Sequence, residues 1–237
     1  MNETLTLLSF GDAGWGDEIA RGVLITVTLA LATLPFGLLL GFILALAKRS
    51  TEPSLRMAAN VYTTIFRGLP ELLTLFLVYY GVQIGLQKLI QLAGFEFHIE
   101  VNSFVAGMVA LACVFSAYAS EAFLSAFSGI PKGQYEGGYA LGLPRGKTMR
   151  LIILPQLIRL ALPALGNLWL ILLKETSLVS VIGLADLIRQ AGIAARVTKE
   201  PFLFFGIACG IYLILAIISS VGIERVERWS KRGEVAR

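Results

Sequence analysis

Five ionisable residues lie inside or beside stretches that are apolar enough to cross a lipid bilayer: Arg67, Glu71, Glu121, Lys174 and Glu175. Charged groups at that depth are costly unless they pair with one another or face a wet cavity, so they are default candidates for a functional site. Glu121 and Glu175 could receive the cationic part of a solute, and Lys174 could receive a carboxylate. Tyr118 is a weaker candidate, because a membrane aromatic more often packs than binds. The alternative for each charge is an ion pair within the protein, and the sequence leaves both possibilities open.

The chain offers few residues for catalysis or metal binding. His98 is the only histidine, and Cys113 and Cys209 are isolated in apolar segments, so we expect no catalytic residues, no metal and no cofactor. The stretch 142–148 resembles a phosphate-binding loop, but it is one residue short between its glycines, and Pro144 lacks a backbone N–H that such a loop offers. Any ATP hydrolysis is therefore expected on another chain. The basic residues form no single stripe, which argues against a nucleic-acid partner.

The composition is that of an integral membrane protein. Hydrophobic residues make up 56% of the 237 residues, charged residues only 15%, and the mean hydropathy is +0.75. Five segments are near or above the roughly 20 apolar residues that a membrane helix needs. These segments are 22–47, 69–92, 104–127, 157–182 and 201–223. We therefore predict an all-α membrane protein with five transmembrane helices in one domain, 1–237.

The charges beside the segments predict the orientation of the chain. Asp17 and Glu18 precede the first segment and Lys48 and Arg49 follow it, which is the reverse of a signal peptide. With the N-terminus outside, the inner segments carry 14 Lys and Arg residues and the outer segments carry 5. We expect a periplasmic N-terminus and a cytoplasmic C-terminus. The connection between the third and fourth segments then lies in the cytoplasm.

Three pairs of glycines in the apolar segments have GxxxG spacing: Gly37 and Gly41, Gly81 and Gly85, Gly206 and Gly210. Such pairs can mark places where two membrane helices approach closely. With 24 glycines in the chain they also arise by chance. The sequence leaves the two interpretations equally open.

A spaced string of residues lies in the predicted cytoplasmic connection: Glu136, Gly137, Gly138, Gly142, Ile152, Leu154 and Pro155. Pro131 can begin a short helix here, and Gly142 with Pro144 can end it. Residues 145–153 can form a second short helix that leads into the fourth segment. Glu136 is expected to cap the turn, to pair with a nearby base or to be solvated. A protrusion with a defined bend and a rigid link to a membrane helix suits the transmission of force.

This spacing resembles the EAA loop of ABC importer permeases, in which EAA, three residues, Gly, nine residues, Ile, one residue and Leu-Pro follow one another. Gly137 and Gly138 replace the two alanines of that pattern. The resemblance implies a type I ABC importer permease fold. It also implies that the loop, about 131–155, is a cytoplasmic helical hairpin that docks into a separate ATPase subunit.

Two further strings narrow the resemblance. The string around Arg67, Gly68 and Pro70 looks like the RGxP signature of polar amino-acid permeases of the histidine/lysine-arginine-ornithine family, and 173–180 resembles the K-x-T-S/A-L string of that group. The chain is similar to the Q-type subunit of the histidine permease and to octopine and nopaline permeases. The resemblance implies a bacterial inner-membrane subunit that moves a polar amino acid or an opine. Its implied partners are a second, paralogous permease subunit, two ATP-binding subunits and a periplasmic solute-binding protein.

Three other classes of membrane protein compete with this interpretation. A secondary transporter or channel driven by an ion gradient is disfavoured, because five helices show no inverted repeat. A membrane enzyme lacks a recognisable catalytic cluster. A membrane anchor that transports nothing would not need the spacing of the 136–155 string.

Overall fold

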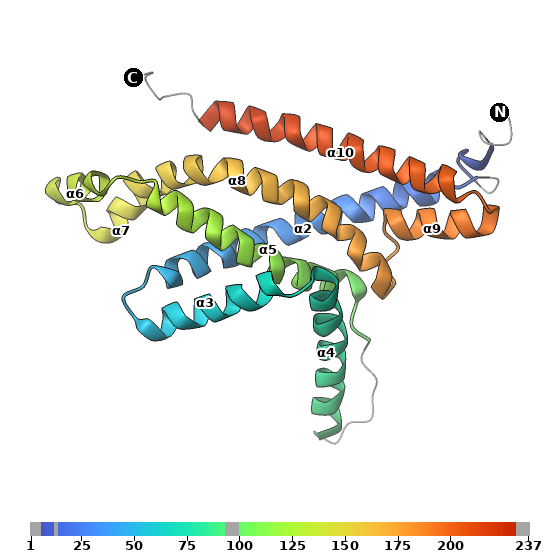
Figure 1. Ribbon diagram of the computed structural model, residues 1–237, viewed down its shortest axis with the longest axis horizontal. Helices are drawn as coiled ribbons and strands as arrows, with labels where there is room; N and C mark the ends of the chain where they lie inside the picture. The colour runs from blue at the N-terminus through green and yellow to red at the C-terminus, as the bar shows by residue number, and fades with distance from the viewer. Residues whose placement is uncertain (1–5, 12–13, 93–99, 231–237) are drawn as a thin grey trace.

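The computed structural model describes residues 6–11, 14–92 and 100–230, and within these ranges the chain is helical without strands (Figure 1). His98 lies outside the described residues. The helices are α2 (Gly16–Lys48), α3 (Pro53–Gly68), α4 (Glu71–Leu92), α5 (Ser103–Ser128), α6 (Lys132–Ala140), α7 (Arg145–Thr148), a π-helical segment (Met149–Ile153), α8 (Leu154–Glu175), a 3₁₀ segment (Thr176–Ile182), α9 (Leu187–Thr198) and α10 (Pro201–Ser230).

Five helical stretches of the described chain are long and apolar enough to cross a membrane, as the sequence predicted. They are α2, α4, α5, the stretch Arg145–Ile182 and α10. The fourth is longer than expected, because α7 does not form a separate helix. It continues through the π-helical segment into α8, and Pro155 falls in the first turn of α8. Its missing N–H is tolerated there because the helical ladder changes from π to α at that point.

Two helices lie in segments that the sequence analysis treated as connections. Helix α3 begins at Pro53 and lies across α5. The hydroxyl of Tyr62 on α3 lies 3.2 Å from the Cys113 carbonyl oxygen and 3.0 Å from Ser116 Oγ, and these contacts fix α3 on α5. Helix α9 is capped at its N-terminus by Asp186. Both helices are amphipathic and too polar to be recognised as membrane spans, so a search for long apolar runs passes over them.

Helices α2 and α5 form the centre of the bundle. A Cβ atom at Gly37 would lie 2.5 Å from the ring of Phe115, and one at Gly41 would lie 2.8 Å from the Cβ of Ala119. The first GxxxG pair therefore permits a close helix contact. A Cβ would meet no heavy atom within 4 Å at the members of the other two pairs, Gly81, Gly85, Gly206 and Gly210. Close packing within this chain is thus confirmed for the first pair alone.

Helix α4 stands away from the other helices (Figure 1). Only Thr74 and Leu75 are buried along it. Its large exposed apolar side chains include Leu73, Leu77, Ile84 and Leu89. A helix this apolar needs lipid or another polypeptide around it, so α4 marks the side on which the bundle is open.

At the end of the bundle opposite α6, helix α9 packs between α2 and α10 through an apolar cluster that includes Leu187, Ala191 and Phe204, and the buried Asp186 lies at the N-terminus of α9. Asp186 Oδ1 accepts a hydrogen bond of 3.0 Å from the N–H of Arg189, and the N–H of Leu187 donates to Thr26 Oγ1 at 3.2 Å. Asp186 Oδ2 is buried without a partner among the described residues. Burial raises the pKa of Asp186 to about 6, although the N–H groups of α9 and Arg189 act against this rise. Tyr212 of α10 also faces the carboxyl group.

We expect Asp186→Asn to stabilise the chain above pH 6. The folded state binds more protons than the unfolded state between about pH 4 and pH 6, so stability falls as the pH rises through this window. Ionising the buried carboxyl at neutral pH costs on the order of 2–3 kcal/mol. Asn keeps the cap and removes the charge. Thermal unfolding of the detergent-solubilised chain from pH 4 to pH 8 should show a fall for the wild type and a flatter profile for Asp186→Asn. Identical profiles would contradict this assignment.

Candidate functional site

The segment 131–155 forms a hairpin at one end of the bundle (Figure 1). Pro131 precedes the first turn of α6, and the helix ends at Ala140. Gly142 then adopts φ 76°, a left-handed conformation that favours glycine. Its N–H donates to the Tyr139 carbonyl at 2.9 Å, and the next N–H, that of Leu143, donates to the Gly138 carbonyl at 3.1 Å. These contacts confirm that α6 begins and ends where the sequence predicted.

The two arms of the hairpin are in close contact. A Cβ at Gly138 would lie 2.5 Å from Cγ2 of the buried Thr148, so only glycine fits without movement of the opposite arm. The amide nitrogen of Gln156 donates to Gln134 Oε1 at 2.9 Å and ties α8 to α6. A Cβ at Gly137, in contrast, would meet no heavy atom within 4 Å. One of the two departures from the EAA pattern is therefore explained by packing, and nothing in the structure explains the other.

The outer surface of the hairpin is open. Glu136 is exposed and takes part in no ion pair or hydrogen bond of its side chain within the described ranges, so it is a solvated charge rather than a cap. Leu141 at the tip is 79% exposed and Tyr139 is 46% exposed. Ile152 and Leu154 are half-buried against the core, and Pro155 is exposed in the first turn of α8. An exposed apolar tip on a rigid hairpin can bind another protein.

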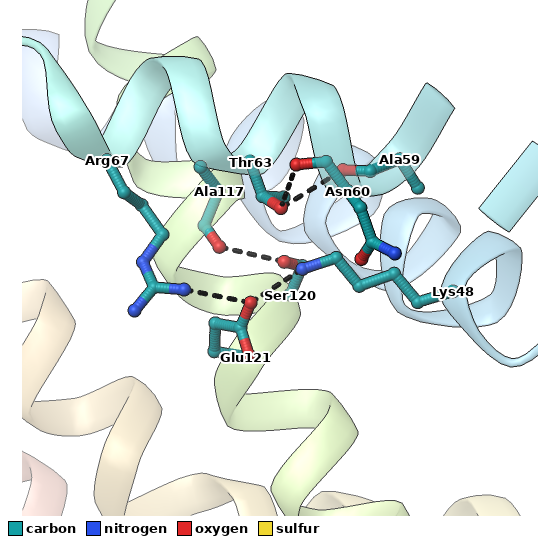
Figure 2. A network of polar contacts seen from close by, with 8 residues as sticks. All are labelled: Lys48, Ala59, Asn60, Thr63, Arg67, Ala117, Ser120 and Glu121. Carbon is teal, nitrogen blue, oxygen red and sulfur yellow. Dashed lines mark hydrogen bonds and ion pairs between the residues drawn. The ribbon is translucent and has the colours of Figure 1, made fainter. Parts of the chain in front are cut away.

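Glu121 lies at the centre of an ion-pair network where the C-terminal half of α5 meets α2 and α3 (Figure 2). Its Oε1 lies 2.6 Å from Lys48 Nζ and 2.9 Å from Arg67 Nη1. The Arg67 guanidinium carbon is 5.7 Å from the centroid of the Tyr118 ring. Three sequence-predicted site residues are therefore in one cluster. The fourth member, Lys48, was interpreted only as a positive charge that ends the first span.

A second group of charges gathers where α4 begins and α8 ends. Glu175 is half-buried and lies within electrostatic range of Glu71 and Lys174. None of these three forms an ion pair within the part of the chain that the structure describes. The described part of the chain includes no cluster of His, Cys, Asp and Glu that could hold a metal ion. The group can therefore offer charges of both signs to a molecule outside the chain.

Comparison with known proteins identifies the chain's relatives. The family described as "Binding-protein-dependent transport system inner membrane component" matches residues 37–228. The nopaline transport system permease protein NocQ of Agrobacterium fabrum is 43% identical over 97% of this chain and 98% of its own length. The histidine/lysine/arginine/ornithine transport system permease protein HisQ of Salmonella typhimurium is 37% identical over 91% of this chain and 94% of its own.

A solved structure agrees with these relatives. A chain in the crystal structure of an amino acid ABC transporter with histidines superposes with a TM-score of 0.76 and 34% identity, over 90% of this chain and 94% of that one. The family match includes the C-terminal part of α2 from residue 37, the hairpin, both charge clusters and most of α10. The chain therefore belongs to the family of binding-protein-dependent transport system inner membrane components.

Proposed function

We propose that this chain is the permease subunit of an ATP-driven importer that carries a polar or basic amino acid or an opine across the bacterial inner membrane. Its relatives include a nopaline permease and a histidine/lysine/arginine/ornithine permease, which support these substrate classes. The observation that carries the proposal is the hairpin 131–155, a rigid protrusion with an exposed apolar tip that continues directly into the span α8. ATP is hydrolysed on a partner chain.

The hairpin receives the movement of that ATPase. Tyr139 and Leu141 present the docking surface, while Gly138 and Gly142 fix the shape of the bend. Glu136 and Gly137 lie on the open side of α6, where they face the partner. Ile152, Leu154 and Pro155 connect the second arm to α8, so a push on the tip moves a membrane helix as a rigid lever.

The substrate path runs past the charges of α4 and α8. Glu71 and Glu175 receive a guanidinium or ammonium group, and Lys174 receives a carboxylate, since none of the three is neutralised by an ion pair in the described chain. Glu121 is bound to both Arg67 and Lys48, which supports a structural role, with Tyr118 packed beside Arg67. Arg67, Glu121 and Tyr118 face the substrate path only where this ion-pair network opens.

The complete importer contains a second permease subunit, two ATP-binding subunits and a periplasmic solute-binding protein. The exposed apolar side of α4 supports contact with the second permease subunit. The excess of Lys and Arg in the inner segments supports a periplasmic N-terminus and a cytoplasmic C-terminus. The paralogous partner implied by the resemblance makes the pair of permease subunits a heterodimer.

Reconstitution into liposomes tests the proposal. The chain alone should take up none of the probes arginine, histidine, octopine or nopaline, with or without an ion gradient. Uptake should begin when the second permease, the ATPase, a binding protein and ATP are added. Gradient-driven uptake by the chain alone would support a secondary transporter instead, which the family assignment does not favour.

We expect Glu175→Gln to change solute preference more than assembly. Loss of one charge beside a bound guanidinium weakens binding by about tenfold, or roughly 1.4 kcal/mol. ATP hydrolysis stimulated by arginine should therefore fall about tenfold relative to that stimulated by a neutral amino acid such as glutamine. Glu224→Gln, in an exposed pair with Arg228, is the matched control. An unchanged preference would remove Glu175 from the path.

A further inference from the structure

Arg49, the residue that caps the C-terminal end of α2, contacts the hairpin through its side chain. Its guanidinium carbon lies 4.0 Å from the centroid of the Phe127 ring on α5 and 6.0 Å from that of Tyr135 on α6. Both terminal nitrogens donate to the Tyr135 hydroxyl at 3.4 Å. A guanidinium group stacked on an aromatic face can form both contacts at once, because it is planar and its N–H groups lie in the plane.

Helix α6 needs such a contact. Its main packing partners in the described chain are α7 and the π-helical segment, which are the opposite arm of the same hairpin. The covalent connections lead to α5 through Gly129 and Ile130, and to α8 through the second arm. Among the described residues, the bonds of Arg49 to Tyr135 are the side-chain hydrogen bonds that join the first arm to the end of α2. Arg49 is therefore a direct link between the hairpin and this span.

Lys48, the residue before Arg49, connects the end of α2 to two other helices. Lys48 bonds to Glu121 of α5, and Glu121 bonds to Arg67 of α3 (Figure 2). The Lys48 side chain is only 5% exposed, so this end of α2 is firmly held in the bundle. Two consecutive residues thus join the inner end of α2 to α5 and α3 on one side and to α6 on the other.

We propose that Arg49 is a positioning residue that clamps the first arm of the hairpin to the inner ends of α2 and α5. A displacement of the hairpin then moves α2 directly, in addition to the lever through α8. This inference rests on the proposed function, because it assumes that an ATPase displaces the hairpin. It gives Arg49 a role in coupling. Arg49 belongs neither to the residues of the EAA spacing nor to the charges proposed to bind the substrate.

A distance measurement tests the clamp itself. Spin labels on α6 at Lys132→Cys and on α2 at Leu46→Cys, with Cys113 and Cys209 replaced by alanine, report the distance between the hairpin and the span. In the assembled importer the wild-type distribution should be narrow. Arg49→Ala should widen it at least about twofold while the purified complex keeps its subunits. An unchanged distribution would overturn the inference.

Transport in the same complex tests what the clamp does. Arg49→Ala should lower solute uptake about tenfold while ATP hydrolysis continues, because the motor is then poorly connected to α2. Arg49→Lys keeps the charge but cannot stack in the same way, so it should recover less than half of the lost uptake. Arg56→Ala removes an exposed positive charge on α3 and should behave as wild type. Full recovery by Arg49→Lys, or wild-type uptake by Arg49→Ala, would overturn the inference.

The proposed function and this inference fail in different ways. A wild-type complex that takes up none of the four probes in the presence of ATP would overturn the proposed function, whatever Arg49 does. A wild-type complex that transports, together with an Arg49→Ala complex that transports equally well, would overturn only the clamp.

Discussion

Gly142→Asp should lower uptake at least about 100-fold while the chain remains in the membrane. Gly142 holds φ 76° in the bend of the hairpin, where a residue with a Cβ atom is strained by up to roughly 1–2 kcal/mol, Asp and Asn less than most. A Cβ would meet no heavy atom within 4 Å, so the effect comes from the backbone and from the new charge rather than from a clash. Because the bend orients the docking surface, a small change there misplaces it relative to the ATPase. Uptake by reconstituted complexes and the amount of chain in the membrane fraction measure the two parts of this result.

Gly133→Ala is the matched control for Gly142→Asp. It lies in the same hairpin, in a helical conformation and facing open space, so we expect uptake within about twofold of wild type. Gly142→Asn should fall between the two, because Asn tolerates the left-handed backbone as Asp does but adds no charge. Uptake by Gly142→Asp above half of the wild-type value would show that the bend is not needed for coupling.

Glu121→Gln should destabilise the folded chain by about 2 kcal/mol. The substitution leaves Lys48, whose side chain is 5% exposed, without a counter-charge. Breaking a buried ion pair costs about 3–5 kcal/mol, and the 37% exposure of Glu121 reduces that value. The change should lower the thermal unfolding midpoint of the detergent-solubilised chain by roughly 4–8 °C.

Two further variants separate the contributions to this network. Lys48→Gln combined with Glu121→Gln should recover part of the lost stability, because no unpaired charge then remains buried. Arg67→Gln alone should cost less than Glu121→Gln, since the Arg67 side chain is 43% exposed. An unfolding midpoint of Glu121→Gln equal to that of the wild type would mean that Lys48 reaches solvent in the folded protein.

Local signals in the sequence were enough to predict the spans and the hairpin. The apolar runs need no tertiary information, because a bilayer imposes their length. Pro131 and Gly142 set the ends of α6 through their own backbone preferences, which act within a few residues. The family resemblance rested on the same local spacing, and the comparisons confirmed it.

The contacts between distant segments could not be predicted in this way. Lys48 and Glu121 are 73 residues apart, and Arg49 and Tyr135 are 86 apart. Such pairs depend on how α2, α5 and α6 pack, and a single sequence carries no signal for them. Helix α3 was missed for a related reason. It is held in place by its contacts with α5, and its own composition is not apolar enough to mark it as a membrane helix.

Thiol labelling of the hairpin tests the central claim most directly. The variant Tyr139→Cys, in a chain without Cys113 and Cys209, carries a single cysteine. It is treated with a membrane-impermeant maleimide, once in intact spheroplasts and once in inverted membrane vesicles. We predict labelling in the inverted vesicles and protection from labelling when the ATPase is bound to them. Labelling in intact spheroplasts would place the hairpin outside the cell and contradict its role as the docking site of an ATPase.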